Sequence, residues 1–234
     1  MHELWPWQRR EVTVKRKDYC WSSEVKVNRR ILRKPLWILG IAFGMGLSAC
    51  SKDSSTGPGP APVEKDYLAL GWSNFESQKY DSAVTNFTAA YNQATAASVR
   101  GEALGGRGWA YTYKRELSKG KADFVFAHGL TGITSPVLDD IRVGGAFVLF
   151  STNDFSTAAS YASAALTSNP SYAFTHDSKI TARRVRILLA QSYYAAGQFT
   201  DCAAQLDLLD TAHAPHTIDP ASLLVAITSL LNTL

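Results

Sequence analysis

The stretch DYLALGWSNFESQKYDSAVTNFTAAYNQ, residues 66–93, decides the fold class of this chain. Its apolar residues recur three or four positions apart on either side of a polar break, at Tyr67, Leu70, Ala83, Val84, Phe87, Ala90 and Tyr91. Such spacing places side chains on one face of an α-helix. We therefore expect two helices joined by a tight turn, with Asp81 capping the second helix.

The same pattern recurs further along the chain, with small and aromatic residues at helical spacing. In residues 149–170 the matching positions are Phe155, Ala158, Ala162 and Ala165, at the spacing of Tyr80, Ala83, Phe87 and Ala90. In residues 187–209 they are Leu189, Ala190, Tyr193, Gly197, Phe199, Cys202, Leu206 and Leu209. A weaker copy in residues 103–127 keeps Gly108, Tyr111, Phe124 and Ala127. A unit repeated in this way indicates a stack of helical hairpins.

These copies resemble the tetratricopeptide repeat (TPR), a family of helix-turn-helix units 34 residues long. The match is best at Ala190, Tyr193, Gly197 and Phe199. The turn glycine of the family is missing from the first three copies, the second copy has Leu117 and Gly120 where an aromatic and an alanine belong, and extra residues separate copies three and four. The resemblance covers residues 64–216 and implies an all-α, TPR-like superhelix of about four helix-turn-helix repeats. Small residues then let neighbouring helices approach, aromatic residues fill the gaps, and at least three hairpins must stack to bury their apolar faces.

Residues 217–234 form a separate segment, which we expect to be a C-terminal capping helix. Asp219 is placed to cap it and Pro220 to occupy its first turn. One apolar stripe follows, at Leu223, Leu224, Ile227, Leu230, Leu231 and Leu234. Residues 220–234 carry no charged side chain, so a subunit interface is the alternative to a cap over the last repeat.

The N-terminal segment has the composition of an export signal. Residues 29–34 are strongly basic, and the apolar run 36–49 is shorter than the roughly 20 residues that span a bilayer. Leu47-Ser48-Ala49-Cys50 resembles the lipobox of bacterial lipoproteins, which implies cleavage before Cys50 and lipid attachment to its thiol. We interpret residues 1–49 as a cytoplasmic extension plus lipoprotein signal peptide, and residues 50–63 as the lipidated cysteine and a flexible Ser/Gly/Pro linker.

The charge distribution excludes one class of partner. Residues 1–49 carry a net charge of +6 and residues 50–234 a net charge of −2, so the basic character of the chain belongs to its leader. Nucleic-acid binding needs a basic stripe on the folded part. We therefore expect no nucleic-acid partner.

We find no catalytic constellation and expect no enzyme, no metal and no cofactor. The stretch GGRGWAY, residues 105–111, lacks the third glycine of a dinucleotide loop. His213 and His216 have no cysteine beside them and only distant acids. We expect Asp139 and Asp140 to end a loop and cap a helix, and Cys202 to be a small buried thiol.

The first helices of the repeats carry the candidate binding residues. In TPR superhelices these helices line the concave surface, and alignment carries seven aromatic positions onto it: Trp72, Phe75, Trp109, Tyr113, Phe147, Phe150 and Tyr194. Such a wall suits a peptide or a partner helix. The alternative is that these side chains pack between repeats or beneath a loop.

Together these features predict a lipid-anchored cell-envelope TPR protein that mediates protein–protein interactions, as a scaffold or assembly factor. Its partners would be envelope proteins or peptides, and its lipid would hold it to the membrane. Ser51 favours the outer membrane, facing the periplasm, by analogy with enteric bacteria. The alternatives are a ligand- or glycan-binding envelope lipoprotein and a self-assembling structural protein.

Overall fold

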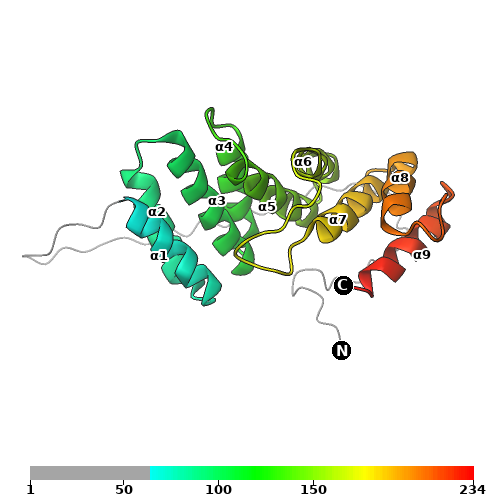
Figure 1. Cartoon of the computed structure of the whole chain (residues 1–234), viewed down its shortest axis with the longest axis horizontal. Helices are drawn as coiled ribbons and strands as arrows, with labels where there is room; N and C mark the ends of the chain where they lie inside the picture. The colour runs from blue at the N-terminus through cyan, green and yellow to red at the C-terminus, as the bar shows by residue number, and fades with distance from the viewer. Residues whose placement is uncertain (1–63) are drawn as a thin grey trace, which may run out of the picture. The chain divides into compact units, whose positions relative to one another are not determined.

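A computed structural model describes residues 64–234, and every element within this range is helical apart from one isolated β-bridge (Figure 1). The predicted signal peptide, Cys50 and the predicted linker lie outside the described residues. The helices are α1 (Glu64–Glu76), α2 (Tyr80–Gln93), α3 (Ala97–Tyr113), α4 (Leu117–His128), α5 (Val137–Ser151), α6 (Phe155–Ser168), α7 (Ala182–Ala195), α8 (Phe199–Leu209) and α9 (Pro220–Leu231). No helix in this range has the length and apolar content needed to cross a bilayer.

Consecutive helices pack in pairs and the pairs follow one another in chain order. Figure 1 shows the series running from α1 and α2 to α8 and α9, and each of the first eight helices packs against the next. The four hairpins are α1–α2, α3–α4, α5–α6 and α7–α8, and α9 closes the series against α7 and α8. The prediction of an all-α, TPR-like superhelix is confirmed.

All four hairpins turn in the same way. One residue in each turn has a left-handed backbone, namely Gln78, Arg115, Asn153 and Gly197, with φ between 59° and 75°. The next N–H then bonds back to a carbonyl five residues earlier, as from Lys79 to Asn74 at 2.8 Å. This bond satisfies a carbonyl at the helix end. The first three turns therefore have the same geometry as the fourth, although they have Gln78, Arg115 and Asn153 where the fourth has Gly197.

The hairpins approach closely because phenylalanine rings occupy the space that glycines leave by having no Cβ atom. Phe87 of α2 lies against Gly71 of α1 and Gly106 of α3, where an added Cβ would fall 2.5 Å and 2.4 Å from its ring. Phe124 of α4 meets Gly144 of α5 in the same manner, at 2.3 Å. Both rings are fully buried. These contacts agree with the expectation that small residues let helices approach and aromatic residues fill the gaps.

The helix caps predicted at Asp81 and Asp219 have different outcomes. The Asp219 carboxylate accepts a hydrogen bond from the Ser222 N–H at 2.8 Å and caps α9, with Pro220 in its first turn, as predicted. The prediction for Asp81 is wrong, because α2 begins at Tyr80 and Asp81 lies inside the first turn. Its carboxylate instead pairs with the Lys114 ammonium at 2.5 Å.

The glycine contacts give a stability prediction. Gly106→Ala pushes a methyl group into the Phe87 ring, and we expect the free energy of unfolding to fall by about 1–2 kcal/mol, since the clash outweighs the helix propensity gained. Gly129→Ala is the matched control, because its added Cβ would approach nothing closer than 3.5 Å. Urea unfolding followed by circular dichroism measures both. Equal midpoints for the two variants would contradict a close contact between the Phe87 ring and Gly106.

Candidate functional site

The seven predicted aromatic residues lie on the first helices of the hairpins but do not form an exposed surface. Trp72, Phe75, Trp109 and Phe147 are 9%, 3%, 2% and 2% exposed and belong to the main hydrophobic core. Tyr113 and Phe150 pack against that core, and Tyr194 packs against the smaller cluster of α7–α9. Of the two alternatives, the structure shows the second, because these side chains are covered; partner binding by them stays a prediction.

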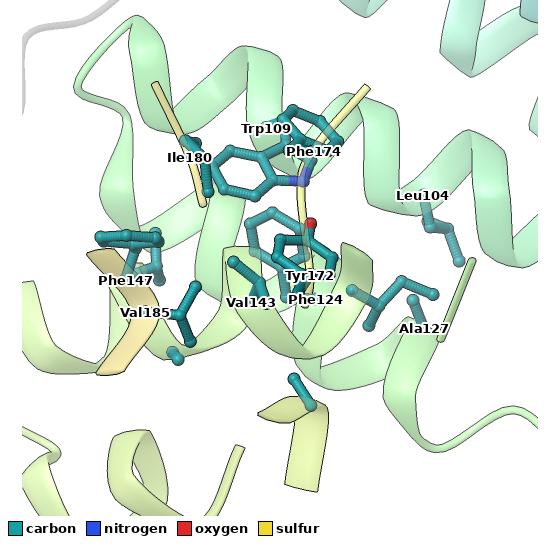
Figure 2. Close-up of a cluster of buried hydrophobic side chains, with 14 of the residues drawn as sticks. Leu104, Trp109, Phe124, Ala127, Val143, Phe147, Tyr172, Phe174, Ile180 and Val185 are labelled. Carbon is teal, nitrogen blue, oxygen red and sulfur yellow. The ribbon is translucent and has the colours of Figure 1, made fainter. Parts of the chain in front are cut away.

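The cover is the segment between α6 and α7, residues 169–181, which we call the strap. Its side chains alternate, because Tyr172 and Phe174 are buried whereas Ala173 and Thr175 are exposed. This period of two is that of an extended chain. Figure 2 shows Tyr172 and Phe174 among side chains of α3, α4 and α5. The strap thus covers the aromatic residues for which the sequence analysis proposed partner binding.

Successive inward side chains of the strap touch the first helices in reverse chain order. The Tyr172 hydroxyl donates to Asp140 Oδ1 of α5 at 2.7 Å. The Phe174 ring stacks on Trp109 of α3, with centroids 4.7 Å apart (Figure 2). The His176 ring stacks on Trp72 of α1, with centroids 3.7 Å apart and planes 2° from parallel. The strap therefore crosses three hairpins as an extended peptide.

Polar side chains and a backbone hydrogen bond within the strap complete its contacts. His176 Nδ1 lies 2.7 Å from Glu76 Oε1, and the Tyr113 hydroxyl donates to the Asp177 carboxylate. The Phe174 N–H donates to the Ile180 carbonyl at 2.9 Å, which folds the strap into a narrow hairpin. These bonds satisfy most polar groups that the strap brings to the core.

Two acidic side chains, Glu102 and Asp140, lie near the strap. Glu102 accepts a hydrogen bond from Trp72 Nε1 at 3.1 Å. Burial raises the pKa of Asp140 to about 6, with further contributions from the charges of Asp139 and Glu102, while the Tyr172 hydrogen bond acts in the opposite direction. Burial also raises the pKa of the Tyr172 hydroxyl, so it remains a proton donor.

One buried donor in this region has no partner. Trp109 Nε1 makes no hydrogen bond to any described residue, although the side chain is 2% exposed. An unsatisfied buried N–H costs about 1–3 kcal/mol. The strap fills the space over Trp109 but offers no acceptor to its indole.

The remaining candidate residues have structural roles. Cys202 is a buried free thiol, as expected, and burial raises its pKa to about 11. The cap predicted at Asp139 and Asp140 is wrong, since α5 starts at Val137 after Pro136 and both acids lie within its first turn. His213 and His216 pair with single aspartates, Asp210 and Asp207. Among residues 64–234, no group of three His, Cys, Asp or Glu could hold a metal ion.

The strap is the feature that sequence reasoning missed. Its signals were the extra residues between copies three and four and the alternation of Tyr172, Phe174 and His176 with small residues. Both signals are visible in the sequence, but neither states which surface the segment covers.

Comparison with solved structures supports a TPR-like fold. The solved structure titled "MamA MSR-1 C2", of a TPR-repeat protein, matches with a TM-score of 0.50 at 14% sequence identity, over 73% of this chain and 86% of that chain. No protein-family model matches the chain, and no curated protein matches its sequence. At this identity the likeness shows the fold alone.

The buried carboxyl beneath the strap predicts a pH dependence. The pKa of Asp140 is about 6 in the folded chain and about 4 when unfolded, so its stabilising effect is full below pH 4 and is lost as pH rises through 6. Asparagine cannot ionise, and we expect Asp140→Asn to exceed the wild type in stability by about 1–2 kcal/mol near pH 7.5, with a smaller gain near pH 4.5.

Urea unfolding at the two pH values measures this difference. Asp201→Asn, which removes an exposed carboxyl on α8, is the control and should change stability little at either pH. A variant Asp140→Asn that is less stable than the wild type near pH 7.5 would show that the ionised carboxylate is needed beneath the strap.

Proposed function

We propose that this chain is a lipid-anchored bacterial cell-envelope protein that mediates protein–protein interactions. The lipobox at Leu47–Cys50 and the linker after it support anchoring, and Ser51 supports the outer membrane facing the periplasm. The TPR-like stack supports protein binding in general, because stacked hairpins present extended surfaces to partners. Folds of this kind are typically not catalytic, which supports a scaffold or assembly factor over an enzyme.

One observation carries the proposal for protein binding. The concave first-helix wall holds an extended peptide, the strap, by ring stacking on Trp72 and Trp109 and by a hydrogen bond to Asp140. A surface that holds residues 172–176 of its own chain in this way has the chemistry to hold a partner segment. The fit of an extended chain across three hairpins favours a peptide over a compact solute.

The glycan-binding alternative has less support. A sugar ring stacks on the exposed face of an aromatic side chain, and in this structure Phe174 and His176 occupy the faces of Trp109 and Trp72. A glycan would have to displace both rings and then satisfy its hydroxyl groups in an apolar core.

Self-association through α9 is a second candidate. Leu223, Ile227 and Leu230 are buried against α7 and α8, which agrees with a capping helix. Leu224 and Val225 of the same helix remain 47% and 70% exposed. The ends of repeat stacks ordinarily present polar faces to remain soluble. Because residues 220–234 carry no charge, two copies of this face could pack together without repulsion.

Lipid labelling and in-cell crosslinking test the first proposal. We expect a clickable fatty acid to label the wild type and not Cys50→Ala, because the thiol is the attachment atom. A photo-crosslinking amino acid at exposed Thr175 of the strap should capture envelope proteins in the wild type, and far less in Cys50→Ala. The same group at exposed Ser160 of α6 is the control. Equal labelling of the wild type and Cys50→Ala would reject lipid attachment at Cys50. Equal capture from Thr175 and Ser160 would reject partner binding near the strap.

Co-purification of two differently tagged copies tests the second candidate. We expect Val225→Lys to reduce recovery of the second copy about tenfold, because it places a charge in a dehydrated contact. Ser160→Lys, at an exposed position of α6, adds the same charge away from α9 as a comparison for general effects. Recovery unchanged by Val225→Lys would remove α9 as an interface.

A further inference from the structure

We propose that the strap is an internal ligand, and that a partner's extended segment takes its place on the concave wall. The segment carries two aromatic side chains two residues apart, followed two residues later by an arginine. This inference rests on the proposed protein-binding function and specifies the chemistry of the partner.

The spacing of the partner side chains follows from the strap. Tyr172, Phe174 and His176 alternate inward and meet α5, α3 and α1 in turn. Any extended chain presents side chains to one face at this period. A partner segment therefore needs an aromatic at each of the first two positions, to reach Asp140 and to stack on Trp109.

The third position favours a planar cation. His176 lies flat on the Trp72 indole and contacts Glu76, whose side chain is 53% exposed. Glu102 accepts a hydrogen bond from the Trp72 Nε1–H. Among residues 64–234, neither Glu102 nor Asp140 forms an ion pair with a Lys or Arg. A guanidinium stacks on an indole face and can form two bonds to a carboxylate. Arginine therefore fits this position better than the histidine of the strap.

The strap leaves one hydrogen-bond donor of the wall without an acceptor. Trp109 Nε1 is buried without an acceptor while the strap is in place. A partner segment that brings a carbonyl or side-chain oxygen to this N–H removes the cost of the unsatisfied donor. The wall is thus not saturated by its own chain.

The contacts of the strap are graded along its length, which gives a route for exchange. Tyr172, Phe174 and Ile180 are at most 3% exposed, whereas the His176 side chain is 21% exposed and Ser178 lies on the surface. Local opening begins where burial is least. These more exposed residues, which we call the tip of the strap, therefore separate from Trp72 first. A partner then binds first at α1 and proceeds toward α5.

Tethering determines how strongly the partner must compete. The strap is fixed at both ends by α6 and α7, so it acts at an effective concentration in the millimolar range. A partner with equal contacts binds weakly to the closed wild type. Loosening the tip should raise the apparent affinity by the factor by which it raises the open fraction.

The test is fluorescence anisotropy on the full chain in detergent micelles. The probe is the fluorescein-labelled peptide PSYAFTHDS, residues 170–178 of this chain, carrying His176→Arg. We expect the protein variant His176→Ala to bind the probe about tenfold more tightly than the wild type, because the tip loses its stack on Trp72 and its contact with Glu76. Thr175→Ala, which changes an outward side chain, is the matched control and should bind like the wild type.

Two comparisons make the result decisive. A probe with Phe174→Ala should bind about tenfold more weakly, since it lacks the ring that stacks on Trp109. Glu76→Gln in the protein should weaken binding of the arginine probe several-fold, and Glu76 is exposed enough that this change leaves the core intact. If His176→Ala is misfolded by circular dichroism, hydrogen exchange on the wild type with probe should show faster exchange in residues 176–179.

The proposal is overturned if the probe binds equally to His176→Ala and the wild type, if its binding does not depend on Phe174, or if it does not alter hydrogen exchange in the strap. A dimer of His176→Ala in place of probe binding would assign the wall to the strap of a second copy, and would also overturn it. None of these results changes lipid labelling at Cys50 or crosslinking in cells, so failure here is distinguishable from failure of the proposed function.

Discussion

The contact of the Phe87 ring with Gly71 and Gly106 is the constraint on which the stack depends. The ring occupies the space where two Cβ atoms would lie, so α1 and α3 can both approach α2. Phe124 and Gly144 repeat the arrangement one hairpin further on. Because interiors are packed without voids, these rings fix the separation of the first helices. That separation, in turn, sets where Trp72 and Trp109 stand relative to each other, and hence the span that an extended segment must cross.

The sequence predicts the helices, their pairing and the small-aromatic packing, because all three follow from local spacing. It fails where a local residue preference meets a backbone requirement. Asp81 is a good capping residue, but the turn through Gln78 starts α2 at Tyr80 and leaves Asp81 within the first turn. Likewise Gln78, Arg115 and Asn153 adopt a left-handed backbone without being glycine, because the helix-end hydrogen bonds hold that conformation.

The sequence predicts the aromatic residues of the first helices but not the strap that covers them. The family resemblance places Trp72, Phe75 and Trp109 on first helices, where the structure has them. It gives no information on residues 169–181, since that segment lies outside the repeat pattern. Its contacts join residues far apart in the sequence, such as Tyr172 with Asp140, and periodicity reports only on near neighbours. Burial beneath a loop was one alternative that the sequence left open, and only the three-dimensional arrangement shows that the strap is that loop.

The bond between His176 and Glu76 joins residues 100 positions apart, from the loop before the fourth hairpin to the first. A stack of repeats usually behaves as a one-dimensional array in which each unit senses only its neighbours and the ends fray independently. This long-range contact couples the first hairpin to the loop before the fourth, so the melting of the hairpins between them becomes more nearly all-or-none. The same contact raises the contact order, and chains whose contacts span such distances reach the native state more slowly. Cooperativity at equilibrium is thus gained together with a slower search during folding.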